Sequence, residues 1–122
     1  MLLTLLLRAL REARSLVVTA SERRKGLVGE AEVAALYRLA GFEWRGLEAE
    51  GDGLALGFGT THHVEVKRQE VARPWAWQVQ AVVDAPPHTL PVVAFRRSRS
   101  PWWAMTPLDE LLAALVRARL TA

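Results

Sequence analysis

The chain has 122 residues, enough for one domain with its own core, and 51% of them are hydrophobic, which excludes a disordered chain. It has no cysteine, which excludes disulfides and cysteine-based zinc sites. The formal net charge is only +3, but 14 of the 16 basic residues are arginines, whose guanidinium groups pair well with phosphate. A charge this small argues for a nucleic-acid partner only where the arginines cluster.

Residues 1–20 predict an amphipathic helix ahead of the main domain. Their apolar residues follow helical spacing, as Leu3, Leu6, Leu7 and Leu10 illustrate. The apolar run comes first, with no basic region before it, so it differs from a signal peptide, and it is too short to span a bilayer. We therefore expect a soluble, intracellular protein without a membrane partner.

The rest of the chain alternates between helical and strand patterns. A basic turn over residues 21–26 leads into a helix that Gly41 ends as a C-terminal cap. The expected helices span residues 27–40, 74–84 and 108–120. The expected strands span residues 42–47, 54–58, 61–68, 91–95 and 102–106, and the second and third form an antiparallel hairpin. This order predicts an α/β domain with a central mixed five-stranded sheet flanked by helices.

The strand predicted over residues 61–68 has a polar face. Because side chains alternate along a strand, Glu65 and Lys67 share that face, while the valines between and before them point to the core. A hairpin turn near Gly59 brings Asp52, at the start of the preceding strand, toward Glu65. The sequence thus places two acids and a lysine together.

A third acid, Glu30, lies on the first long helix of the main domain, shortly after the basic residue Lys25. Three carboxylates and a lysine suit Mg²⁺, which takes hard oxygen ligands and keeps several waters. The ion lowers the pKa of a bound water and shields the charge on a phosphate, and Lys67 can orient or deprotonate that water. Hydrolysis of a phosphodiester needs these parts.

Histidines and tryptophans near these residues have structural interpretations. His62 and His63 point to opposite faces because they are adjacent on a strand. We expect His62 to pack, and His63 to lie at the edge of the site without binding metal. Four tryptophans are expected mostly to pack in the core or an interface, and less often to stack on bases: Trp75, Trp77, Trp102 and Trp103.

The spacing D-(x)12-E-x-K of Asp52, Glu65 and Lys67 resembles the core motif of the PD-(D/E)xK nuclease superfamily. RRKGLVGEAEVAALYRLAGF is similar to the opening of the archaeal-type Holliday junction resolvases, where R-K-G precedes a helix with the first acid. GDGLAL, HVEVKRQE, WAWQVQAVVDA and VVAFRRSRSPWW resemble the segments that follow in that family. The likeness spans residues 23–106, is nearest to the phage-encoded branch, and implies a restriction-endonuclease-like fold.

The resemblance implies one nuclease domain over residues 1–122. Its parts would be a helical extension over 1–20, a nuclease core over 23–106 and a C-terminal helix over 107–120.

The resemblance also implies the roles of individual residues. The implied ligands of Mg²⁺, for which Mn²⁺ would substitute, are Glu30, Asp52, Glu65 and the carbonyl of Val66. Lys67 would assist the attacking water. Gln80 would be the glutamine that often supports the metal ligands in such nucleases, with Gln78 as the alternative.

This chain departs from the family pattern just before the second acid. Gly51 stands where the family usually has a proline, which leaves Glu48 and Glu50 as rivals of Asp52. The loop GLEAEGDG also lacks the serine that archaeal members carry there.

The implied function is a Mg²⁺-dependent endonuclease that resolves four-way DNA junctions by paired symmetric nicks. Two nicks in strands of like polarity require two active sites about a two-fold axis, so we expect a homodimer. We expect no small-molecule cofactor. The protein would act in the cytoplasm, that of the host if it is phage-encoded. The alternatives are a nuclease of the same fold acting on flap, nicked or duplex DNA, and a DNA-binding protein without activity.

Basic residues gather in two short segments, 23–25 and 96–99, and one more follows the lysine of the motif. Contacts with phosphate are expected from Arg23, Arg24, Lys25, Arg68, Arg96, Arg97 and Arg99. No helix presents a pattern of base-reading residues, so the expected readout is of shape and backbone.

Overall fold

The computed structural model describes residues 20–47 and 51–121. The helices in this part are α2 (Ala20–Leu39), α3 (Pro74–Asp84) and α4 (Leu108–Thr121), and the strands are β1 (Glu43–Gly46), β2 (Asp52–Gly57), β3 (Thr60–Arg68), β4 (Leu90–Arg96) and β5 (Trp103–Met105). Residues 1–19 of the expected N-terminal helix lie outside the described residues, as do Glu48 and Glu50. None of the described helices is long and apolar enough to cross a membrane.

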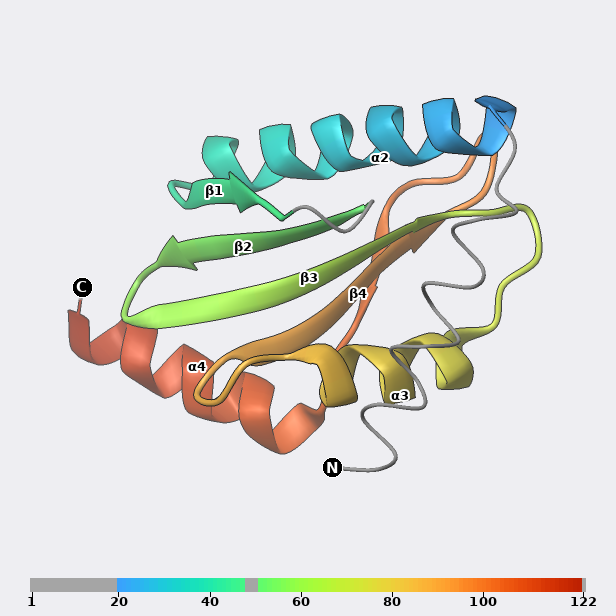
Figure 1. Ribbon diagram of the computed structural model, residues 1–122. Helices are drawn as coiled ribbons and strands as arrows, with labels where there is room; N and C mark the ends of the chain where they lie inside the picture. The colour runs from blue at the N-terminus through green and yellow to red at the C-terminus, as the bar shows by residue number, and fades with distance from the viewer. Residues whose placement is uncertain (1–19, 48–50, 122) are drawn as a thin grey trace.

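The strands form one mixed sheet in the order β1-β2-β3-β4-β5, which confirms the expected α/β architecture. β3 and β4 pair in parallel, and the other neighbouring strands pair antiparallel. The parallel pair is possible because α3 carries the chain from the end of β3 back to the start of β4. Figure 1 shows α2 along one side of the sheet and α3 along the other. The edge strands β1 and β5 are shorter than expected.

α2 begins earlier than the sequence pattern suggests. The expected turn over residues 21–26 is wrong, because these residues are helical. Arginine, lysine and glutamate are good helix formers, and the single Gly26 costs only about 1 kcal/mol relative to alanine. The helix ends as expected, with Gly41 at φ 98° and the Phe42 N–H donating to the Tyr37 carbonyl. This pattern is a Schellman C-cap.

β2 and β3 form the expected hairpin through a two-residue turn. Phe58 at φ 54° and Gly59 at φ 72° both have positive φ, as in the type I′ turns that join antiparallel strands. β2 starts at Asp52, two residues before the strand expected over residues 54–58. The earlier start places Asp52 inside the ladder, directly opposite Glu65.

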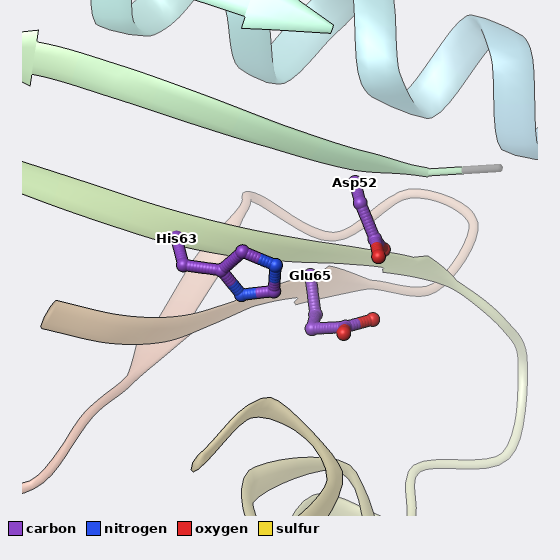
Figure 2. Close-up of side chains that lie close together, drawn as sticks. All are labelled: Asp52, His63 and Glu65. Carbon is purple, nitrogen blue, oxygen red and sulfur yellow. The ribbon is translucent and has the colours of Figure 1, made fainter. Parts of the chain in front are cut away.

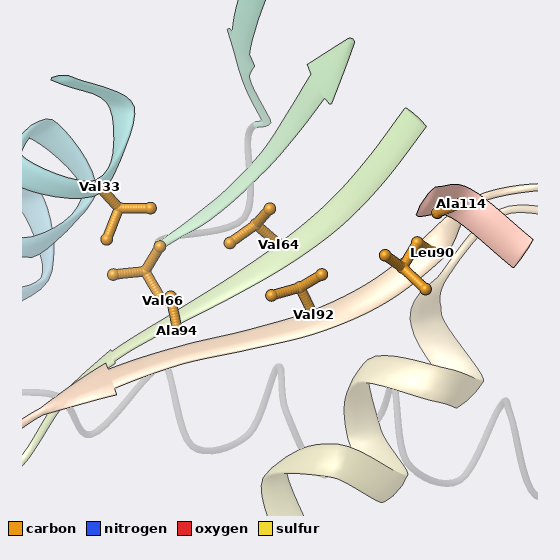
Figure 3. Close-up of a cluster of buried hydrophobic side chains, with 7 residues drawn as sticks. All are labelled: Val33, Val64, Val66, Leu90, Val92, Ala94 and Ala114. Atoms are coloured by element: carbon orange, nitrogen blue, oxygen red, sulfur yellow. The ribbon is translucent and has the colours of Figure 1, made fainter. Parts of the chain in front are cut away.

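The main hydrophobic core lies on the face of the sheet that α2 and α4 cover. Its buried side chains, shown in Figure 3, are Val33, Val64, Val66, Leu90, Val92, Ala94 and Ala114. On β3 and β4 these residues occupy alternate positions. The residues between them therefore point to the opposite face.

The opposite face of the sheet is covered by α3. Trp77 and Ala81 of α3 are buried against Val93 of β4. Val93 is the register partner of Glu65 in β3. Glu65, and with it His63 and Lys67 on the same face of β3, therefore lie on the α3 side, separated from the main core by the sheet itself.

Candidate metal centre

Two acids and a histidine converge on the α3 side of the sheet. Asp52 of β2 and His63 and Glu65 of β3 each place one ligand atom within 4.8 Å of the others. Figure 2 shows the three side chains directed to the same side of the two strands. Their exposed fractions are 2%, 3% and 1%, so the group is buried.

The local sequence explains how these side chains meet. The turn at Phe58 and Gly59 fixes the hairpin register, and counting back from it pairs Asp52 with Glu65. His63 precedes Glu65 by two residues, so strand alternation puts both on one face. The valines of β3 on the other face hold the strand in the core. The geometry of the site thus follows from the two-residue hairpin turn and from the alternation of side chains along β3.

Gly51 allows the backbone to turn tightly into β2. It has φ 78°, and a Cβ placed there would lie 2.9 Å from the Val66 carbonyl oxygen. The Val66 N–H also donates to the Gly51 carbonyl at 2.7 Å. Proline cannot adopt a positive φ. The glycine that departs from the family pattern is therefore required by this backbone, and Asp52 beside it lies opposite Glu65.

The buried group can bind a metal ion. Two carboxylates and an imidazole are all common ligands of divalent metals, and a metal ion is one of the few partners that make buried carboxylates favourable. The residues present therefore fit a divalent cation. The backbone carbonyl of Val66 lies on the same strand as His63 and Glu65 and next to Gly51.

Lys67 continues the polar face of β3 beyond Glu65. It is half-buried and pairs in register with Phe95 of β4. The Phe95 ring lies 5.8 Å from the ring of Trp77, centroid to centroid, so α3 packs on the strand neighbour of the lysine. Lys67 thus lies on the same face as the two acids, beside β4.

Glu30 lies apart from this group. One of its carboxylate oxygens is beside Gly46 of β1, where a Cβ would come within 2.9 Å of it. It also forms a hydrogen bond with Trp44, in a groove lined by Leu27, Ala34 and other residues of α2 and β1. Burial raises the pKa of the Glu30 carboxyl, and the bond with Trp44 opposes the rise. The three-residue metal group does not include it.

The two glutamines of α3 occupy different positions. Gln78 donates from Nε2 to the Pro91 carbonyl at 3.5 Å, and Pro91 is the register partner of His63. Gln80 is half-buried and immediately precedes Ala81, which is buried against the sheet. Both glutamines thus belong to the helix that covers the metal group.

Arg96 is part of a cluster with α2. Its Nε lies 3.5 Å from a carboxylate oxygen of Glu32, and its guanidinium lies 5.5 Å from the ring centroid of Trp102. The Trp102 indole N–H donates to the same Glu32 oxygen at 2.8 Å. The three side chains join α2 to the end of β4. The positive charge of Arg96 is therefore paired with the carboxylate of Glu32.

The turn after β4 presents two exposed arginines. Arg97 and Arg99 are exposed, and Arg99 has φ 62°. Between them, Ser98 donates from its backbone N–H and its hydroxyl to Glu70 Oε1, at 3.1 and 2.5 Å. This pair of bonds fixes the turn to the segment after β3. Arg97 lies two residues beyond Phe95, the partner of Lys67.

The remaining basic residues lie at the start of α2 or under it. Arg24 is exposed, while the side chains of Arg23 and Lys25 lie outside the described part of the structure. Arg68 is half-buried and packs near Gly29 of α2. The first turns of α2 lie at the same end of the molecule as the end of β3 (Figure 1). The two basic segments thus come together at that end.

His62 has the packing role that the sequence suggests. Its Nδ1 is 2.9 Å from the Tyr37 hydroxyl, and its ring contacts those of Tyr37 and Phe42. Burial lowers the pKa of His62 and raises that of Tyr37. His63, expected only at the edge of the site, instead lies within the metal group.

The tryptophans divide into packed and exposed side chains. Trp77 is buried and Trp102 is half-buried, as expected. Trp75 and Trp103 are 76% and 59% exposed, so they do not pack in the core of this chain.

Comparison with known proteins gives no match for this chain, either to models of protein families or among curated proteins.

Proposed function

We propose that this protein is a metal-dependent endonuclease that resolves four-way DNA junctions, with Mg²⁺ as the cofactor. The observation that carries the proposal is the buried pair of Asp52 and Glu65, opposite each other on neighbouring strands, with Lys67 on the same face. Two acids that hold a cation beside a lysine are the minimal parts for phosphodiester hydrolysis.

The residues divide the work in the following way. Asp52 and Glu65 hold the cation, and the Val66 carbonyl is a further oxygen ligand on the same strand. The bound ion supplies positive charge to the scissile phosphate and lowers the pKa of water. Lys67, which lies on the same face as the two acids, orients the attacking water or takes its proton.

DNA binding is proposed for the basic end of the molecule. Arg24, Arg97 and Arg99 are exposed there and can pair with phosphate oxygens. Because Glu70 fixes the turn between the two arginines of the β4–β5 connection, their positions are set before DNA arrives. Contacts to phosphates position a duplex without reading its sequence.

A junction has two strands to cut, and one chain holds one metal group in its described residues. Symmetric nicking of a four-way junction needs two such groups related by a two-fold axis. We therefore propose a homodimer as the active form. Sedimentation of the free protein and of its junction complex tests this part of the proposal.

The decisive experiment is cleavage of a synthetic mobile four-way junction, compared with a duplex of the same sequence. We expect paired symmetric nicks with Mg²⁺ and none with EDTA. Glu65→Gln should lower the cleavage rate on the order of a hundredfold or more while junction affinity is retained. Glu43→Gln, the same change at an exposed pair with Arg45, is the matched control and should cut normally.

Three results would contradict the proposal in different ways. Equal binding and cutting of duplex and junction would indicate a nuclease without junction selectivity. Binding without cutting by the wild type would indicate a DNA-binding protein. Equal cutting by the wild type and Glu65→Gln would remove the buried acids from the reaction.

A further inference from the structure

His63 adds a nitrogen donor to a site that the proposed chemistry assigns to oxygen ligands. It lies on the Glu65 face of β3, is only 3% exposed, and places a ring nitrogen within 4.8 Å of the ligand atoms of Asp52 and Glu65 (Figure 2). A two-carboxylate site for Mg²⁺ has no need of an imidazole. The position of His63 therefore calls for a chemical explanation.

The backbone holds His63 in this position. Its register partners are Leu54 in β2 and Pro91 in β4. Strand pairing on both sides therefore fixes the backbone of His63. Gln78 of α3 donates a hydrogen bond to the carbonyl of Pro91, the β4 partner of His63, and so ties α3 to the sheet beside it. The imidazole thus belongs to a rigid strand inside the sheet, as a ligand group must.

Mg²⁺ and Mn²⁺ respond differently to an imidazole. Mg²⁺ demands hard oxygen ligands in near-ideal octahedral geometry. Mn²⁺ also binds carboxylates, but as a first-row transition ion it accepts nitrogen ligands as well. A site with two carboxylates and one imidazole is therefore expected to favour Mn²⁺.

We propose that His63 is a direct metal ligand and makes this centre bind Mn²⁺ more tightly than Mg²⁺. The inference rests on the metal site of the proposed function, and it adds the identity of the preferred ion and the residue that selects it. Mg²⁺ remains able to occupy the site through Asp52 and Glu65. Loss of the imidazole should convert the centre to one with little preference.

The first test needs no variant. Mn²⁺ is added to the metal-free full-length protein, and electron spin-echo envelope modulation records the nuclei that surround the bound ion. We expect a ¹⁴N coupling from one directly bound imidazole nitrogen. Mn²⁺ bound without a ¹⁴N coupling overturns the inference and leaves the proposed nuclease intact. Absence of Mn²⁺ binding also overturns it.

The second test assigns the nitrogen and measures selectivity. In His63→Gln the ¹⁴N coupling should disappear, and the ratio of Mn²⁺ to Mg²⁺ affinity should fall on the order of tenfold or more, measured by titration calorimetry. His88→Gln changes an exposed histidine in the α3–β4 connection and should leave both readouts unchanged. An unchanged coupling or affinity ratio in His63→Gln overturns the assignment.

These outcomes are separate from nuclease activity. If the protein binds Mn²⁺ through His63 but cuts no DNA, the proposed function fails and the inference stands. If it cuts junctions but its bound Mn²⁺ shows no imidazole ligand, the inference fails and the proposed function stands.

Discussion

Asp52 lies directly opposite Glu65 in the antiparallel register of β2 and β3, and both side chains are almost completely buried. Like charges at opposed strand positions repel, and burying a carboxylate costs free energy unless a cation or hydrogen bonds offset it. A bound cation would offset this repulsion, so the protein is expected to be more stable with the metal than without it.

A thermal unfolding experiment tests this relationship. At an ion concentration one hundred times the dissociation constant, binding adds about 2.7 kcal/mol to the free energy of unfolding. For a chain of this length that corresponds to a rise in Tm of roughly 8–13 °C. We expect this rise for the wild type with Mn²⁺ or Mg²⁺, and little or none for Glu65→Gln, because the variant lacks a ligand.

The same unfolding experiment in EDTA, without metal, measures the effect of the repulsion between the Asp52 and Glu65 carboxylates. Glu65→Gln removes one of the two charges at nearly constant volume, so its Tm in EDTA should equal or exceed that of the wild type. Glu43→Gln, at an exposed position, should follow the wild type with and without metal. A large loss of Tm in Glu65→Gln in EDTA would show that the acid stabilises the fold without metal.

Lys67 should affect chemistry and leave metal binding unchanged. It lies on the face of Glu65 but is not part of the three-residue ligand group. In Lys67→Gln we expect the cleavage rate to fall roughly 10²–10⁴-fold, the range for loss of a positioned acid or base. The Mn²⁺ affinity measured by calorimetry should stay the same. A parallel loss of metal affinity would make the lysine part of the metal site.

Arg97 and Arg99 should contribute to DNA affinity in a salt-dependent way. Each arginine that pairs with a phosphate releases about one counterion, so the double change to glutamine should lower the slope of log affinity against log salt by about 2. The loss should be similar for junction and duplex. Fluorescence anisotropy over a range of salt concentrations gives the slope.

The control for this pair removes the same charge elsewhere. Arg117 and Arg119 are exposed near the end of α4, and Arg117 lies beside the β2–β3 turn at Gly59, at the other end of the sheet from Arg97. Their double change to glutamine should leave the slope nearly unchanged. Equal effects of the two double variants would mean that only net charge matters. Arg96 is a poor choice for either test, because its loss also breaks the contacts with Glu32 and Trp102.

Two glycine substitutions should have opposite effects on stability. Gly51→Ala forces a side chain into a positive φ and against the Val66 carbonyl, so it should lower the free energy of unfolding by about 1–3 kcal/mol. Gly26→Ala, inside α2 with open space around it, should raise it by about 0.5–1 kcal/mol. Urea denaturation measures both. A neutral Gly51→Ala would contradict the tight approach of the two backbones.

The fold was largely predictable because its signals are local. The alternation of β3, the prolines that begin α3 and precede α4, and the cap at Gly41 each depend on a few neighbouring residues. The meeting of Asp52 and Glu65 could also be predicted, because it requires only a count from the turn at Gly59. The prediction for the start of α2 was wrong because it gave more weight to Gly26 than to the arginines, lysine and glutamate before it, which are good helix formers.

The positions of Glu30 and His63 depend on longer-range packing. Glu30 faces β1 because of the way α2 lies across the sheet, and no spacing in the sequence specifies that angle. The signal for His63 was present, since alternation puts it on the face of Glu65. Its burial among ligands, however, depends on the cover that α3 supplies, which only the tertiary structure shows.

The hairpin turn at Phe58 and Gly59 also bears on how the molecule assembles. A two-residue connection lets β2 and β3 pair within microseconds, whereas the parallel pairing of β3 with β4 must wait for α3 to form and cross over. Asp52 and Glu65 should therefore meet while their surroundings are still open to water. An ion can then enter during folding, before the helix closes over it, and stopped-flow refolding with and without Mn²⁺ would reveal a faster final step when the ion is present from the start.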